Sequence, residues 1–342
     1  MNGDEVRFGL MLAAQFEAGV DPVPKMTESI QQVAAARMSN FHSVWTVQHF
    51  LADFQYFQPV PLLARLAAEA GDMYLGTGIL LVPHYPPVIL AEELATLSVL
   101  NGGRFILGAG SGYREQEFQA IGVPVKERYG RLEESIELMR KLWSGKPVEH
   151  HGKFYDVSGA QMSLVPPQRE KLPVWVGATG PIGIRRAARI GDEWLATGEL
   201  TIEDLVARQA TFIEALDDDD SADNHCFPLV REVLVGDTSQ EARRQAEQAL
   251  RQKYASYEKW GHPVRPIDEL LDSVIAVGSP QECLERLSRV FAESRSRYLI
   301  LRMQWPASSH AATMKSIELF GEHVAPELQR MYGAARDTGV DA

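Results

Sequence analysis

The chain has 342 residues, 45% of them hydrophobic and 23% charged, a balance typical of a folded globular protein. Its net charge is −12, with 34 Lys and Arg against 46 Asp and Glu. Nucleic acids and anionic membranes are bound by clustered positive charge, so this balance argues against both as partners. The N-terminus lacks the pattern of a signal peptide, and no segment is apolar for long enough to span a membrane. We therefore expect a cytoplasmic protein.

Short apolar segments alternate with amphipathic segments along the chain. Strands are predicted at residues 8–12, 43–47, 74–82, 104–109, 174–176, 193–196, 229–235 and 297–303. Helices are predicted at residues 26–38, 61–70, 88–100, 128–143, 182–189, 201–216, from 238 onward, 279–292 and 313–324. This α/β alternation predicts a single (β/α)8 TIM barrel over residues 1–342, with connector or insertion segments at 144–172 and 256–277.

Polar clusters and cysteines give no indication of a metal site. The run Asp217 to Asp220 is expected to be a solvated loop, because adjacent carboxylates repel one another. The pair His150-His151 is expected in an exposed turn, since it lacks a third ligand at a metal-binding spacing. Cys226 and Cys283 are too few for a disulfide framework, and we expect both to be buried thiols.

His49 is the first candidate catalytic residue. It follows the predicted second strand, and the carboxyl ends of barrel strands are where catalytic groups are expected. An imidazole titrates near neutral pH and is suited to general acid/base work. The alternative is that His49 has a structural role and caps the strand by bonding to the backbone. The neighbouring loops must distinguish these two roles.

Three glycine-containing segments lie at the ends of predicted strands. Gly76 and Gly78 interrupt an apolar strand, which indicates a bend or the close approach of a ligand. Gly108 to Gly112 fails the dinucleotide fingerprint because Tyr113 follows it, but a loop of small residues still cradles phosphate. The turn Gly177 to Gly180 precedes Pro181, which suits the first position of a helix whose free N–H groups attract anions.

Together these segments resemble the bacterial luciferase-like family of flavin-dependent oxidoreductases over nearly the whole chain. The segments that carry the resemblance are SVWTVQHF, YLGTGILLVPHYPP, GGRFILGAGSGYREQEFQAIGVP, YGRLEESIELMRKLW, VWVGATGPIGIRRAARIGDEWL and VGSPQECLERL. The resemblance implies a barrel that binds a flavin-type coenzyme at the carboxyl ends of its strands. It places His49 at the catalytic histidine of luciferases, and Gly78-Ile79 at a non-proline cis peptide behind the flavin ring.

The resemblance also implies a set of coenzyme-binding residues in three loops. They are Gly78, Ile79, Gly110, Ser111, Gly112, Gly177, Ala178, Thr179 and Gly180. Two departures argue against light emission. Luciferases have Glu-His-His where this chain has Gln48-His49-Phe50, and a phosphate-binding arginine at the position of Ser111. The Gly180-Pro181 pair is common in the branch that uses a deazaflavin.

The first functional hypothesis is a monooxygenase that uses reduced FMN, supplied by a separate flavin reductase, to oxygenate a small organic substrate. An apolar substrate pocket is expected from Phe16, Trp45, Phe50, Tyr113 and Trp305, with segment 256–277 as a candidate lid. The alternatives are hydride transfer from a reduced deazaflavin, and a flavin-binding protein without catalysis. A homo-oligomer is expected from the resemblance.

Overall fold

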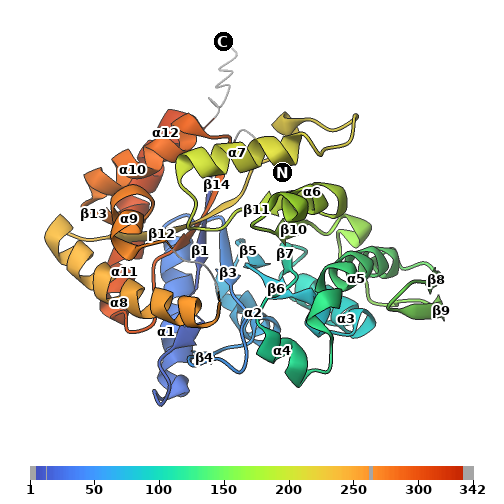
Figure 1. The fold of residues 1–342 in the computed structure, drawn as a ribbon. Helices are drawn as coiled ribbons and strands as arrows, with labels where there is room; N and C mark the ends of the chain where they lie inside the picture. The colour runs from blue at the N-terminus through green and yellow to red at the C-terminus, as the bar shows by residue number, and fades with distance from the viewer. Residues whose placement is uncertain (1–4, 13, 262–264, 334–342) are drawn as a thin grey trace, which may run out of the picture.

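The computed structural model describes residues 5–12, 14–261 and 265–333, and Figure 1 shows their arrangement. A curled sheet lies at the centre, and its paired strands are parallel. In order across the sheet the strands are β11 (Glu193–Leu195), β10 (Val174–Gly177), β7 (Phe105–Gly110), β5 (Tyr74–Thr77), β3 (Ser43–Thr46), β1 (Arg7–Met11), β14 (Tyr298–Arg302), β12 (Leu229–Val235) and β13 (Ala276–Gly278), with β6 (Leu80–Leu81) paired to β7. An isolated parallel bridge also joins Ala196, just after β11, to Leu229 of β12.

Helices surround this sheet and alternate with its strands along the chain (Figure 1). They are α1 (Pro22–Met38), α2 (Pro59–Ala70), α3 (Pro87–Leu100), α4 (Glu115–Ala120), α5 (Arg128–Trp143), α6 (Pro181–Ile190), α7 (Ile202–Ile213), α8 (Ser239–Lys259), α9 (Ile267–Ser273), α10 (Pro280–Glu293), α11 (His310–Leu319) and α12 (Ala325–Tyr332). A π-helical turn, Phe320–Val324, joins α11 to α12. The predicted α/β alternation is confirmed.

Two apolar layers hold the sheet, one on each of its faces. The larger layer packs strand side chains such as Phe8 and Leu107 against the surrounding helices. The smaller layer fills the inside of the curl, where Trp45 stacks on Trp175 with ring centroids 5.0 Å apart and Tyr298 meets Trp175 edge-on. Burial on both faces explains why these strands appear in the sequence as continuous apolar runs.

Helix starts follow the signals in the sequence. Ser279 and Glu282 form a reciprocal capping box at α10, and Thr201 caps α7 by accepting from the Asp204 N–H. Pro181 occupies the first turn of α6, as predicted. Both cysteines are buried and free, and burial raises the pKa of Cys283 to about 12. None of the described helices is both long and apolar enough to cross a membrane.

Two predictions about connecting segments are wrong. The break expected from Ser256 comes later, because α8 continues to Lys259, and the segment then contains α9 and β13; residues 262–264 lie outside the described chain. The connector 144–172 contains a hairpin of β8 (Val148–His151) and β9 (Asp156–Ala160), so His150 and His151 lie in a strand. Strands alternate their side chains between two faces, so His151 is exposed while His150 is buried.

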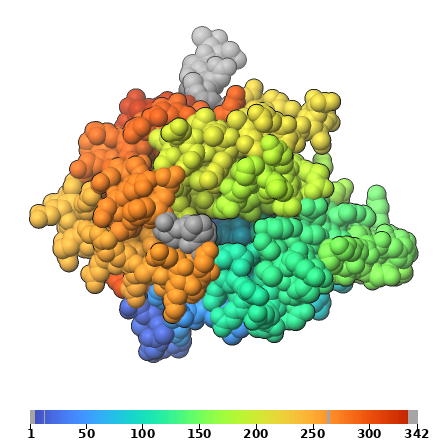
Figure 2. Space-filling model, in the orientation of Figure 1, coloured from blue at the N-terminus to red at the C-terminus, as the bar shows by residue number. Residues whose placement is uncertain are grey.

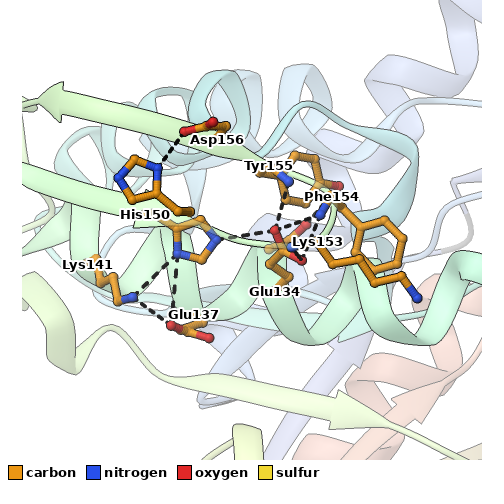
Figure 3. Close-up of polar contacts among 10 residues, drawn as sticks. Glu134, Glu137, Lys141, His150, Lys153, Phe154, Tyr155 and Asp156 are labelled. Atoms are coloured by element: carbon orange, nitrogen blue, oxygen red, sulfur yellow. Dashed lines mark hydrogen bonds and ion pairs between the residues drawn. The ribbon is translucent and has the colours of Figure 1, made fainter.

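The hairpin is attached to α5 through Glu134, as Figure 3 shows. The Glu134 carboxylate accepts backbone N–H bonds from Lys153, Phe154 and Tyr155 at 2.8 to 3.1 Å, and lies 3.3 Å from His150 Nε2. These contacts satisfy the backbone of the hairpin loop and fix His150 in a structural role.

The short elements near the N-terminal half were not predicted. β2 (Gln15–Phe16) and β4 (Gln55–Tyr56) form a two-stranded ribbon, and α4 has six residues. Elements this short carry too little periodicity to be detected in a sequence. They matter for function, because α4 and the ribbon both contact the segment around His49.

Candidate active site

A cavity of about 750 Å³ opens at the carboxyl ends of the parallel strands. Its lining comes from the segments that follow β3, β5, β7, β10 and β11, and from β12, β14 and α8. In the space-filling view, this face is hollowed near its centre, between the green and the orange parts of the chain (Figure 2). Cavities of this size are typical of sites for small molecules and coenzymes.

Most of the predicted coenzyme-binding residues line this cavity together with His49. They are Gly78, Ile79, Ser111, Gly112, Gly177, Ala178, Thr179 and Gly180. The peptide bond between Gly78 and Ile79 is cis, as the resemblance implied. Gly110 lies behind the lining, in β7, where a Cβ atom would overlap the side chain of Ile79. Glycine at position 110 therefore allows Ile79 to pack against the strand.

The five residues predicted to shape a substrate pocket separate into different places. Only Tyr113 lines the main cavity. Trp45 is fully buried inside the curled sheet, and Phe50 packs against His84 with ring centroids 5.3 Å apart. Phe16 and Trp305 line a smaller cavity of about 190 Å³. The structure therefore does not bring these four side chains together with Tyr113 in the lining of the main cavity.

The inner apolar layer forms the floor of the main cavity. Val47, Ile79, Leu195 and Val230 line the cavity and also pack on the cluster that contains Trp45. This arrangement gives the cavity an apolar base that excludes water from its deepest part.

His49 is held at the cavity wall by a buried ion-pair network. Its Nδ1 lies 3.2 Å from Oε1 of Glu117, which also accepts from Nη1 of Arg114 at 2.9 Å and from the Phe50 N–H at 3.3 Å. The side chain of His49 is 12% exposed and that of Glu117 only 1%. Burial alone would raise the pKa of Glu117, but His49, Arg114 and the Phe50 N–H together bring that pKa below its usual value.

An acidic partner on Nδ1 leaves Nε2 as the ring nitrogen available toward the cavity. A carboxylate that bonds one ring nitrogen fixes the orientation and tautomer of the imidazole. Aromatic rings surround His49 on several sides, with ring centroids 5.3 to 6.4 Å away. They belong to Tyr56, Tyr113, Tyr257 and Trp260. The site therefore holds one oriented proton carrier inside an aromatic enclosure.

One end of the cavity has the donors that a phosphate needs. The first turn of α6 presents N–H groups that no helix carbonyl can satisfy, and Ile182, Gly183 and Arg186 line the cavity beside it. Ser111 adds a hydroxyl to the lining from the end of β7, the strand that neighbours β10. A Cβ atom at Gly180 would meet no atom within 4 Å, so glycine leaves open space at this end. The donor set and the open space fit the phosphate of a flavin coenzyme.

Another part of the wall carries buried charges. Glu232 of β12 pairs with Lys253 of α8 and accepts from Tyr254 Oη at 2.7 Å and Trp305 Nε1 at 3.1 Å. Glu232 and Lys253 are only 2% and 3% exposed. Arg302, at the end of β14, lines the same wall. Glu117, Glu232 and Arg302 were not predicted as site residues, because none of them belongs to a recognisable sequence motif.

The described residues contain no group of three His, Cys, Asp or Glu side chains placed to hold a metal ion. The cavity combines an imidazole at its wall, an apolar floor and free helix N–H groups at one end. Such a constellation suits an organic coenzyme with a flat ring and a phosphate.

Comparison of the sequence with known families assigns its class. Residues 6–297 match the luciferase-like monooxygenase family, and the chain belongs to it. It is 26% identical to 4-hydroxyprotoasukamycin monooxygenase of Streptomyces nodosus subsp. asukaensis, over 94% of this chain and 92% of that one. It is 25% identical to 5,10-methylenetetrahydromethanopterin reductase of Archaeoglobus fulgidus, over 91% and 99%. The relatives are oxidoreductases, which supports an enzymatic role.

Solved structures show the same fold. The monooxygenase RslO1 from Streptomyces bottropensis matches with a TM-score of 0.84 at 23% identity, over 94% of this chain and 99% of that one. The oxygenating constituent of 3,6-diketocamphane monooxygenase from Pseudomonas putida, in complex with FMN, matches at 0.78 and 20% identity, over 94% and 99%. An F420-dependent secondary alcohol dehydrogenase matches at 0.79 and 19% identity, over 95% and 99%.

Proposed function

We propose that this protein is a flavin-dependent monooxygenase that uses reduced FMN and dioxygen to oxygenate a small organic substrate. The observation that carries the proposal is the joining, in one cavity, of His49, the Gly78-Ile79 peptide and the phosphate-type donors around Gly180. Bound reduced FMN would supply the electrons that activate dioxygen. The full-length likeness to a monooxygenase supports this chemistry.

Each part of the cavity has a role in this proposal. Ser111, Gly112, Gly177 to Gly180 and the first turn of α6 hold the phosphate end of the coenzyme. Ile79 and the apolar floor support its ring and keep water out. His49 moves a proton at Nε2, and Glu117 orients its ring through Nδ1.

Hydride transfer from a reduced deazaflavin is the second candidate. It is favoured by the full-length likeness to a methylenetetrahydromethanopterin reductase and by the Gly180-Pro181 turn at α6. In this reading His49 protonates or deprotonates the substrate, and dioxygen takes no part.

Anaerobic titration distinguishes the two candidates. The purified protein is titrated with oxidised FMN, reduced FMN and reduced deazaflavin, and oxygen is then admitted. Tight binding of reduced FMN, followed by oxygen consumption, is expected. Binding of deazaflavin alone, with no oxygen consumed, would overturn the oxygenase proposal. The absence of turnover with any reduced coenzyme would revive the non-catalytic alternative.

We further infer that the curled sheet closes into a complete (β/α)8 barrel. The bridge between Ala196 and Leu229 supports closure, with N···O distances of 2.9 Å from Ala196 N to Pro228 O and 3.0 Å from Val230 N to Ala196 O. A separate flavin reductase and a homo-oligomeric state belong to the same proposal. Sedimentation of the purified protein, alone and with a flavin reductase, tests both.

A further inference from the structure

Arg302 differs from the other cations that line the main cavity. Arg186 forms an ion pair with Glu133, and Lys253 forms one with Glu232. Arg302 is only 6% exposed, yet it forms no ion pair with a described carboxylate. Its contacts are long and neutral, 3.4 Å to Tyr257 Oη and 3.2 Å to Gln15 Oε1, and its Nε atom has no partner among the described residues.

The neighbouring carboxylate of Glu232 attracts the charge of Arg302 but forms neither an ion pair nor a hydrogen bond with it among the described contacts. Glu232 lies opposite Arg302 in the strand register, but its oxygens bind Lys253, Tyr254 and Trp305. A guanidinium stays protonated in proteins, and charge-assisted bonds to an anion are stronger than the two neutral contacts that Arg302 makes here. Arg302 also lines the cavity directly, so a ligand there can reach it.

Arg231 is a second buried arginine, and its contacts are those of a structural residue. Arg231 is 1% exposed and also has no carboxylate partner among the described residues, but its Nη1 donates to the carbonyls of Gly198 and Leu200 at 3.0 and 2.9 Å. It does not line the cavity and instead fixes the loop after β11. Arg302 has no carbonyl bonds of this kind among the described residues.

We propose that Arg302 binds an acidic oxygen of the substrate, either a carboxylate or an ionised enol or phenol. This inference rests on the proposed function, because it assigns the substrate chemistry of the same cavity. Tyr257 links the position to the proton carrier, since its hydroxyl contacts Arg302 and its ring lies 6.4 Å from the ring of His49. An acid group held at Arg302 orients a flat substrate within the aromatic enclosure around His49.

Binding of matched test compounds measures this role without turnover. The wild type, R302M and R231M are each titrated with two pairs of aromatic compounds that differ only in an acid or an amide group. The pairs are 2-naphthoate with 2-naphthamide, and an anthracene carboxylate with its carboxamide. Each titration is done with and without bound FMN. The wild type should prefer each carboxylate over its amide by about tenfold or more, because a charge-assisted bond replaces a neutral one. R302M should bind acid and amide within about twofold, while R231M keeps the preference.

Thermal unfolding separates a binding role from a structural one. R302M should change the unfolding temperature of the ligand-free protein less than R231M does, because Arg302 makes only two long, neutral hydrogen bonds. R231M should unfold at a lower temperature, because it leaves two carbonyls unsatisfied. The carboxylates should raise the unfolding temperature of the wild type and not that of R302M.

Three outcomes would overturn the proposal: no acid preference in the wild type, an unchanged preference in R302M, or weaker FMN binding in R302M, which would make Arg302 a coenzyme contact. Failure of the wild type to bind FMN would instead count against the proposed function. The carboxylate preference would still be measurable on that protein, so the two failures are distinct.

Discussion

Replacing Glu117 with Gln tests whether the buried carboxylate supports the site. The substitution keeps the shape and an acceptor oxygen, but removes the charge that pairs Arg114 and His49. Arg114 is 6% exposed and would keep its bonds to the carbonyls of Phe50 and Leu51, its stacking on a tryptophan ring and a neutral acceptor at position 117, but would lose its buried carboxylate partner. Breaking a buried pair from one side costs about 3–5 kcal/mol, and the retained acceptor reduces this. We expect a loss of about 2–4 kcal/mol in the free energy of unfolding.

Urea unfolding at pH 7 measures this loss, and E115Q is the matched control. Glu115 lies on the same helix but is exposed, so its replacement should change stability by no more than about 0.5 kcal/mol. Because the folded-state pKa of Glu117 is lowered, its contribution is present above the usual value of 4.5 and disappears as the pH falls through the lowered pKa. The difference between the wild type and E117Q should therefore shrink in acid. Equal stabilities of E117Q and E115Q at pH 7 would refute the argument.

Three further predictions concern other sites. H49A should bind FMN within about threefold of the wild type but lower turnover by about 10²-fold, and turnover within a few-fold of the wild type would contradict the role of His49. E134A should accelerate proteolysis of the β8–β9 hairpin, since three backbone N–H groups lose their acceptor, and an unchanged cleavage rate would count against this anchor. Burial lowers the pKa of His225, but Glu193 and Asp220 outweigh burial and raise that pKa above 6.5. Protonated His225 should therefore stabilise the fold at low pH, and this stabilisation should disappear as the pH rises through the raised pKa. Urea unfolding of the wild type and H225Q across pH 5 to 9 checks this, and a constant difference would oppose it.

The sequence predicts the regular elements well where periodicity is long. Helix α5 and strand β12 agree with their predicted ranges, and the caps at Thr201 and Ser279 lie where expected. The end of α8 was misjudged because its last turns are polar and their burial depends on distant partners. Lys253 and Tyr254 both bind Glu232 of β12, and Tyr254 also packs in a buried apolar cluster with residues of β12 and α9.

The sequence predicted the parts of the site that are formed by backbone and glycine residues. Glycines at strand ends indicated the segments that line the cavity, because a loop that approaches a ligand closely leaves a signal in residue type. The side-chain pairs left no such signal. His49 and Glu117 are 68 residues apart, and Gln15 and Arg302 are 287 apart, so only the fold brings each pair together. A buried charge in a sequence looks the same as an exposed one.

The two parts of the cavity are built by different means, and this division bears on specificity. The end of the cavity at α6 consists largely of backbone N–H groups and small residues, whose geometry the fold itself fixes. The wall at Arg302 consists largely of long side chains from β12, β14 and α8, which substitution can change without altering the curled sheet. Substrate choice should therefore respond to changes at Arg302 and Tyr257 while coenzyme affinity does not. Arg302 is the residue at which that separation can be measured, because its buried charge has no described carboxylate partner.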